Sequence, residues 1–113
     1  MITIVIYLIF VIAAIFEVSG DAQIREGLEN KTFLSKAIGL LLLGAYGFTI
    51  NLGIYLKFID WSFSKQLGVY VAIFALVSTL VGWLYFGEKI STLHIIGIVL
   101  ITAGGFVIQY SHN

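Results

Sequence analysis

Long apolar segments alternate with short polar ones along the whole chain. Runs without Asp, Glu, Lys or Arg cover residues 37–56, 67–87 and 93–110. Each run is long enough to cross a hydrocarbon core of about 30 Å as an α-helix that rises about 1.5 Å per residue. An earlier apolar run begins at residue 2 and has acidic residues in its second half. We interpret residues 2–24 as a further membrane span.

The polar segments between these spans are too short to fold by themselves. A chain inside a bilayer must satisfy its backbone groups internally, which favours helices, and short loops make sequential helices antiparallel neighbours. The first run resembles the apolar part of a signal peptide, but no basic residue precedes Arg25 and no cleavage site of small residues follows. The pattern therefore predicts an all-α membrane protein, with residues 1–113 forming a single domain of four transmembrane helices.

Composition supports a membrane location and excludes several classes of function. Apolar residues make up 60% of the chain and charged residues 11%, and the mean hydropathy is +1.07, which is far from the balance of a water-soluble enzyme. Six basic residues against six acidic ones leave no positive surface for nucleic acid. Cysteine is absent, and no nucleotide-binding or hydrolase motif occurs. We expect no enzyme activity, no cofactor and no metal.

Glu17 is the strongest candidate for a functional group. It lies about 22 Å along the first span, roughly two thirds of the way through the hydrocarbon. An ionisable group there is costly and usually faces a cavity or a partner. Ala13, Ala14 and Gly20 are its helical neighbours, and their small side chains leave room for a ligand or a second backbone. Alternatively, Arg25 neutralises Glu17, or protonated Glu17 hydrogen-bonds another helix.

Asp21 and Arg25 continue the stripe of Glu17 along the same helix. Asp21 is expected near the headgroups, where a pair with Arg25 contributes little to stability when it is wet. The alternative is that Asp21 is a second acid that attracts cations into the site of Glu17. Both interpretations of Asp21 remain open at this point.

Other candidates lie on the second and third spans. On the second span, small and polar residues recur at helical spacing: Gly44, Gly47 or Phe48, Asn51 and Tyr55. They form either a cavity lining or a close-packing surface. Tyr70 and Phe74 form an aromatic stripe on the third span that suits a cation or the core. Trp83 lies near the end of that span, as a cavity lining or an interfacial anchor.

Three stretches of sequence resemble the small multidrug resistance (SMR) family of proton-coupled exporters, within the drug/metabolite transporter superfamily. The stretch around Glu17 is similar to the family's first span. Residues 82–89, GWLYFGEK, look like the end of its third span, and residues 96–104, IGIVLITAG, resemble its fourth-span glycine motif. The resemblance covers nearly the whole chain, but the third span lacks the family's usual proline, and Leu67 and Tyr70 stand where that family has tyrosine and tryptophan.

The resemblance implies that protons and a cationic substrate bind Glu17 by turns. Four helices do not readily enclose a substrate, so transport requires at least a dimer, and Gly97, Gly104 and Gly105 would permit close approach of two copies. Loop charges are nearly balanced between the two sides of the membrane, which favours an antiparallel homodimer inserted both ways round.

We therefore expect an integral protein of a bacterial or archaeal plasma membrane that exports cationic, lipophilic compounds in exchange for protons. Its expected partners are a second copy of itself, the cationic small molecule, protons and the lipid bilayer, and nucleic acid is excluded. Two alternatives remain. The protein moves a lipid or polyprenyl head group, or it is a non-transporting subunit of a heterodimeric transporter.

Overall fold

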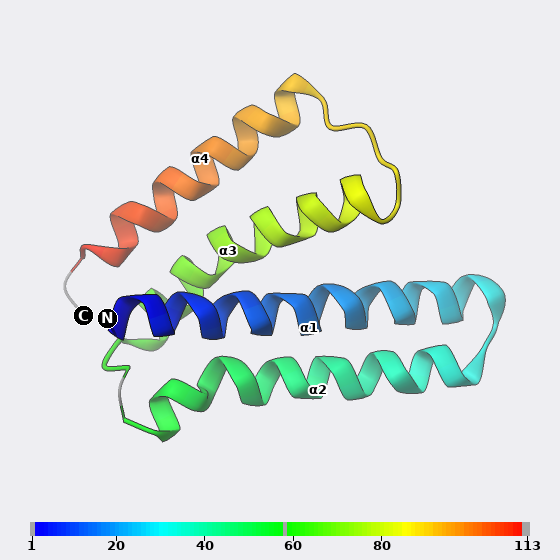
Figure 1. The fold of residues 1–113 in the computed structure, drawn as a ribbon, viewed down its shortest axis with the longest axis horizontal. Coiled ribbons are helices and arrows are strands. Elements are labelled where there is room, and N and C mark those ends of the chain that lie inside the picture. The colour runs from blue at the N-terminus through cyan, green and yellow to red at the C-terminus, as the bar shows by residue number, and fades with distance from the viewer. Residues whose placement is uncertain (1, 58, 112–113) are drawn as a thin grey trace. The chain divides into compact units, whose positions relative to one another are not determined.

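A computed structural model describes residues 2–57 and 59–111, with only the backbone of residue 2. These residues form helices α1 (Ile2–Asn30), α2 (Phe33–Tyr55), α3 (Phe63–Leu84) and α4 (Thr92–Gln109), and no strand occurs in the described ranges (Figure 1). All four helices are long and apolar enough to cross a membrane. The structure thus confirms the predicted all-helical membrane protein.

The chain divides into two compact units, residues 1–59 and residues 60–113. The first unit is a hairpin of α1 and α2, and the second is a hairpin of α3 and α4 (Figure 1). In each hairpin the connection is short, so the two helices run antiparallel. Each unit is described separately below.

The first helix continues beyond the predicted span, which was placed at residues 2–24. It ends at Asn30, and only Lys31 and Thr32 separate it from α2. The predicted end was taken from hydropathy, which shows only the part of a helix that lies in lipid. The segment after residue 24 is polar, and because it contains no proline, the helix can continue through it. The exposed pair of Arg25 Nε and Glu29 Oε1, 3.5 Å apart, has the helical i,i+4 spacing. The helix is about 43 Å long, so it either projects beyond a hydrocarbon core of about 30 Å or tilts.

The end of α1 is closed by a left-handed residue. Lys31 has a φ angle of 53°, and the Thr32 N–H donates to the Gly27 carbonyl at 2.9 Å. This is the hydrogen bond of a Schellman cap, in which glycine usually occupies the left-handed position. Lysine therefore holds this conformation against a steric cost.

Replacing Lys31 by glycine should stabilise the protein. The expected gain in the free energy of unfolding is about 1 kcal/mol, because glycine adopts a positive φ without strain. Thermal unfolding in detergent, followed by circular dichroism, measures the change. Asn30→Gly is the matched control: Asn30 is the last residue of the helix and has no positive φ, so glycine there relieves no strain and should not stabilise the protein. Equal effects at the two positions would contradict this account of the cap.

A regular seam joins α1 and α2. A methyl group added at Gly39 would lie 2.8 Å from the Gly20 carbonyl oxygen and 2.9 Å from the Ile24 nitrogen, and one added at Gly20 would lie 2.9 Å from Cγ of Leu43. A methyl group at Gly27 would similarly lie 2.6 Å from Cγ of Lys36. The contacting residues therefore have decreasing numbers along α1 and increasing numbers along α2, at intervals of three or four residues, as expected for two antiparallel helices.

The contacts at Gly20, Gly27 and Gly39 establish three pairs of positions, and the same spacing continued toward the start of α1 gives the remaining seam positions. The seam positions are residues 10, 13, 17, 20, 24 and 27 of α1, which face residues 53, 50, 46, 43, 39 and 36 of α2, respectively. Burial agrees with the assignment at two of these pairs of positions: Phe10 and Ala13 are completely buried on α1, and Ile50 is buried on α2. Gly53 is also buried, but the atoms nearest to it belong to Ile59. The seam forms part of the core of the first unit, which also contains the buried Ile6, Ala14, Val18 and Ile59.

The second unit packs α3 against α4 through small residues at one end. A methyl group added at Gly105 would lie 2.6 Å from Cβ of Ala72, and one added at Gly68 would lie 2.8 Å from Cδ1 of Ile108. Near the opposite end, Thr79 Oγ1 lies 3.1 Å from Nε2 of His94. Contacts at both ends therefore hold this hairpin together.

The turn after α3 differs slightly from the expected one. The predicted span reached residue 87, but α3 ends at Leu84. The Glu88 N–H donates to the Gly82 carbonyl at 2.9 Å, and Gly87 has a φ angle of 66°. The chain thus folds back onto the last turn of the helix, and apolar residues 85–87 belong to this turn because glycine permits the reversal.

Candidate functional site

Glu17 lies in the seam between α1 and α2, opposite Tyr46. One turn before Gly20 on α1 is Glu17, and one turn after Leu43 on α2 is Tyr46. The Glu17 carboxylate is close enough to Tyr46 to act electrostatically on its phenol, in agreement with this register. Both side chains are half-buried. The structure thus brings an acid and a phenol together between two membrane-spanning helices.

Among the small neighbours of Glu17, Gly20 permits close helix packing in the first unit. Ala13 and Ala14 are completely buried. Gly20 faces the backbone of Gly39 and the side chain of Leu43. The sequence allowed either a ligand or a second backbone beside these residues, and at Gly20 the structure places a second backbone. The close approach brings the Glu17 carboxylate near α2.

Asp21 lies one turn beyond Glu17 but outside the seam, and it is exposed. Arg25 forms an ion pair with Glu29 on its own helix. Because both residues of this pair are mostly exposed, it contributes little to stability. The role of Asp21 as a second acid remains a prediction.

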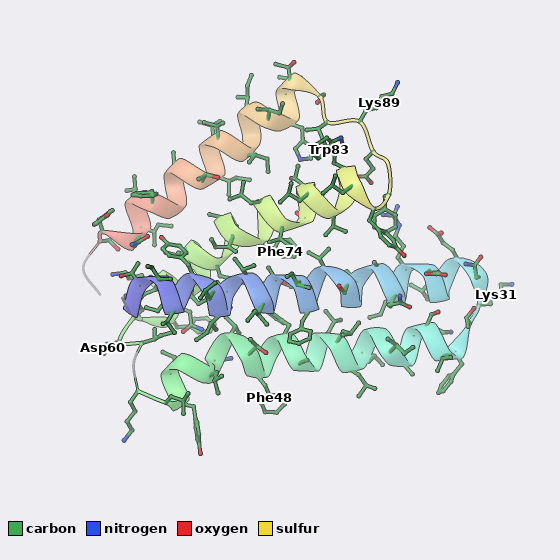
Figure 2. All side chains as sticks on the ribbon, in the orientation of Figure 1. Lys31, Phe48, Asp60, Phe74, Trp83 and Lys89 are labelled. Atoms are coloured by element: carbon green, nitrogen blue, oxygen red, sulfur yellow. The ribbon has the colours of Figure 1, made fainter. Side chains whose placement is uncertain are left out.

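The candidates on α2 lie on its outward face, away from the seam. An added methyl group at Gly44 or Gly47 would meet nothing within 4 Å within the chain. Asn51 is exposed, and its Nδ2 donates to the Gly47 carbonyl at 2.9 Å; Tyr55 is 79% exposed. Figure 2 shows Phe48 pointing away from α1 on this side of the helix. Within the first unit, Asn51 and Tyr55 therefore do not join Glu17.

The aromatic candidates belong to α3, in the second unit. Tyr70 is buried and Phe74 is half-buried, and their ring centroids are 6.2 Å apart. Trp83 is 56% exposed near the end of the helix (Figure 2). The two rings on one face agree with the predicted aromatic stripe. A part for these residues in the site of Glu17 remains a prediction.

The three glycines expected at a dimer contact do not share one environment. Added methyl groups at Gly97 and Gly104 would meet nothing within 4 Å, so their sides of α4 are open within the chain. Gly105 is buried against Ala72 of α3. Within the second unit, Gly105 permits close packing of α3 and α4, whereas Gly97 and Gly104 are available to another surface.

Sequence reasoning missed Tyr46. The residues of α2 that the sequence indicated, the glycines and Asn51, share the opposite face of the helix. The sequence carries no signal that singles out Tyr46, because residues 36, 39, 43, 46, 50 and 53 have only the three- and four-residue spacing of any helix face. The contacts of Gly20, Gly27 and Gly39 fix the register that places Tyr46 opposite the acid.

Comparison with known proteins decides the family. The UPF0060 membrane protein of Mycobacterium marinum is 30% identical over 105 residues, which cover 92% of this chain and 91% of the relative. Similar proteins of Streptomyces coelicolor (33% identical, 91% and 88% covered) and Clavibacter sepedonicus (31%, 90% and 88%) carry the same family name. The chain belongs to the UPF0060 family of membrane proteins.

Membership in the UPF0060 family agrees with the architecture. These relatives are bacterial and are named as membrane proteins, and the chain has four helices capable of spanning a bilayer. The protein is therefore an integral membrane protein, in agreement with the names of its bacterial relatives. No family model matches the chain, and no solved structure matches it. The family name carries no activity, so function is argued from the site.

Proposed function

We propose that this UPF0060 protein is a proton-coupled exporter of cationic, lipophilic compounds. The observation that carries the proposal is the position of Glu17, a half-buried carboxylate in the contact between two membrane-spanning helices, beside the completely buried Ala13 and Ala14. Ionisable groups inside a membrane are costly and typically mark ion or substrate pathways. The resemblance of three sequence stretches to the SMR exporters supports the same assignment.

Exchange follows if a proton and the substrate share one carboxylate. A cation binds ionised Glu17 on one side of the membrane, and a proton replaces it on the other side. Because the two ligands exclude each other, binding of one lowers the apparent affinity for the other, and this linkage is reciprocal. Acidification should therefore weaken cation binding, and cation binding should release protons.

Transport further requires an assembly. One copy supplies four helices, so we propose a homodimer in which two copies of Glu17 share a chamber. Open helix surface at Gly97 and Gly104 supports close contact between copies. The near balance of loop charges supports an antiparallel arrangement, because neither orientation in the membrane is strongly favoured.

The decisive experiment is proton release from detergent-purified protein. Quaternary ammonium, guanidinium and polyamine salts are added near neutral pH in weak buffer, with Glu17→Gln measured in parallel. Release by the wild type that is lost in the variant supports a shared site on Glu17. If none of the three classes of salt releases protons from the wild type, the exporter proposal is overturned. Thermal stabilisation by lipid extracts would then identify a head-group translocator, and failure to cross-link as a self-dimer would identify a partner-dependent subunit.

A further inference from the structure

The α1–α2 seam contains two facing polar residues in an otherwise apolar middle. Around Glu17 and Tyr46 the seam positions are alanine, glycine, isoleucine, leucine and phenylalanine, and the other charged seam residue, Lys36, lies near the start of α2. A polar group inside a bilayer is unfavourable unless it has a hydrogen-bonding partner. The facing positions supply each group with a partner of complementary type.

The position of Tyr46 also differs from that of the tyrosines that lie near the ends of the spans. It lies about 20 Å from the start of α2 at about 1.5 Å per residue, well inside the hydrocarbon. Tyrosine in membrane helices is concentrated at the lipid–water boundary, where its ring and hydroxyl meet apolar and wet surroundings, respectively. That explanation suits the exposed Tyr55 and Tyr110, and it does not apply to Tyr46.

We infer that Tyr46 is a positioning residue for Glu17. Its phenol hydroxyl donates to the ionised carboxylate across the seam when no cargo is bound, and its ring face contacts an organic cation when one binds. A phenol donates to an ionised carboxylate more strongly than to a neutral one, so the contact favours the charged form. The second half of the inference rests on the proposed exporter function, and the first half does not.

Few other charged groups of the first unit bear on Glu17. From α2, Tyr46 faces it directly, and Lys36 lies about three turns away along the seam, opposite Gly27. On α1, Asp21 is one turn away and exposed, and Arg25 is paired with Glu29. A change confined to the Tyr46 hydroxyl should therefore be detected at Glu17 without altering another charge.

The test uses the ligand-free, full-length protein in detergent. Glutamate is labelled with carbon-13 at the carboxyl carbon, and the Glu17 signal is assigned by its loss in Glu17→Gln. In Tyr46→Phe, which keeps the ring, the midpoint of the Glu17 titration should move upward by roughly half to one pH unit. Tyr85→Phe, at the exposed end of α3, is the matched control and should leave the midpoint unchanged. An unchanged midpoint in Tyr46→Phe, or an equal shift in both variants, overturns the inference.

The contribution of the ring is tested separately with tetraphenylphosphonium. Tyr46→Leu removes the aromatic face and should weaken binding by roughly three- to thirtyfold, whereas Tyr46→Phe should retain the ring contact. Equal affinities of the Leu and Phe variants at matched ionisation of Glu17 would overturn the cation contact. If the titration shifts but no cation binds the wild type, the exporter proposal fails while the pairing of Tyr46 with Glu17 stands.

Discussion

Replacing Gly39 by valine is expected to disrupt the α1–α2 hairpin. The first added carbon would lie 2.8 Å from the Gly20 carbonyl oxygen and 2.9 Å from the Ile24 nitrogen, and backbone atoms cannot rotate away. The two helices must separate, so we expect the free energy of unfolding to fall by roughly 2–3 kcal/mol. Unfolding of the purified protein in detergent, followed by circular dichroism, measures this loss.

Gly44→Val provides a control on the same helix. The substitution is identical, but an added methyl group at Gly44 meets nothing within 4 Å. Its effect should stay within about 0.5 kcal/mol, because only helix propensity changes. Because separation of the helices also moves Tyr46 from Glu17, Gly39→Val should lose cation binding along with stability. Comparable stability of the two variants would show that the helices do not approach at Gly39.

Replacing Glu17 by glutamine is expected to abolish proton-driven transport. Glutamine has nearly the same shape as glutamate but neither releases a proton nor carries a charge. The substitution therefore removes the binding site of both the proton and the cation in the proposed exchange. Loss of a charge-assisted contact should weaken cation binding by roughly ten- to a hundredfold. Uptake of a labelled quaternary ammonium ion into proteoliposomes, driven by an imposed pH gradient, should fall to the level of protein-free vesicles.

Glu26→Gln is the corresponding control for charge. Glu26 lies on the same helix beyond the predicted span, where it is exposed. Its substitution removes one carboxylate without changing the seam, so transport should be retained within about twofold. Proton-driven uptake that survived in Glu17→Gln would remove the basis of the proposed function, even if the protein is confirmed as a transporter.

Hydropathy alone was sufficient for the number and approximate position of the helices. Residues 93–110 were predicted as the last span, and α4 covers Thr92–Gln109. The least accurate boundary was the end of α1, because helix formation continues from residue 25 to Asn30 in polar sequence. Lipid selects for apolar side chains, whereas helix ends depend on caps such as the left-handed Lys31.

The candidate site was predictable in part. Glu17 was predictable from the sequence because an acid within an apolar run is energetically costly in a membrane, and such a residue can be recognised without a structure. Gly105 and Gly104 are adjacent in sequence, yet one is buried against Ala72 and the other is open. Neighbouring residues on a helix point in directions about 100° apart, so their environments depend on where the next helix lies.

Four membrane-spanning helices and an acid within the first of them follow from the amino-acid sequence, because both conclusions depend on the transfer of individual side chains between water and lipid. The position of Tyr46 opposite that acid and the contact of Gly20 with Gly39 follow from the packed structure. These pairings depend on the register of one helix against another. Register is set by close contacts between residues far apart in the chain, and the periodicity of either helix alone does not contain it.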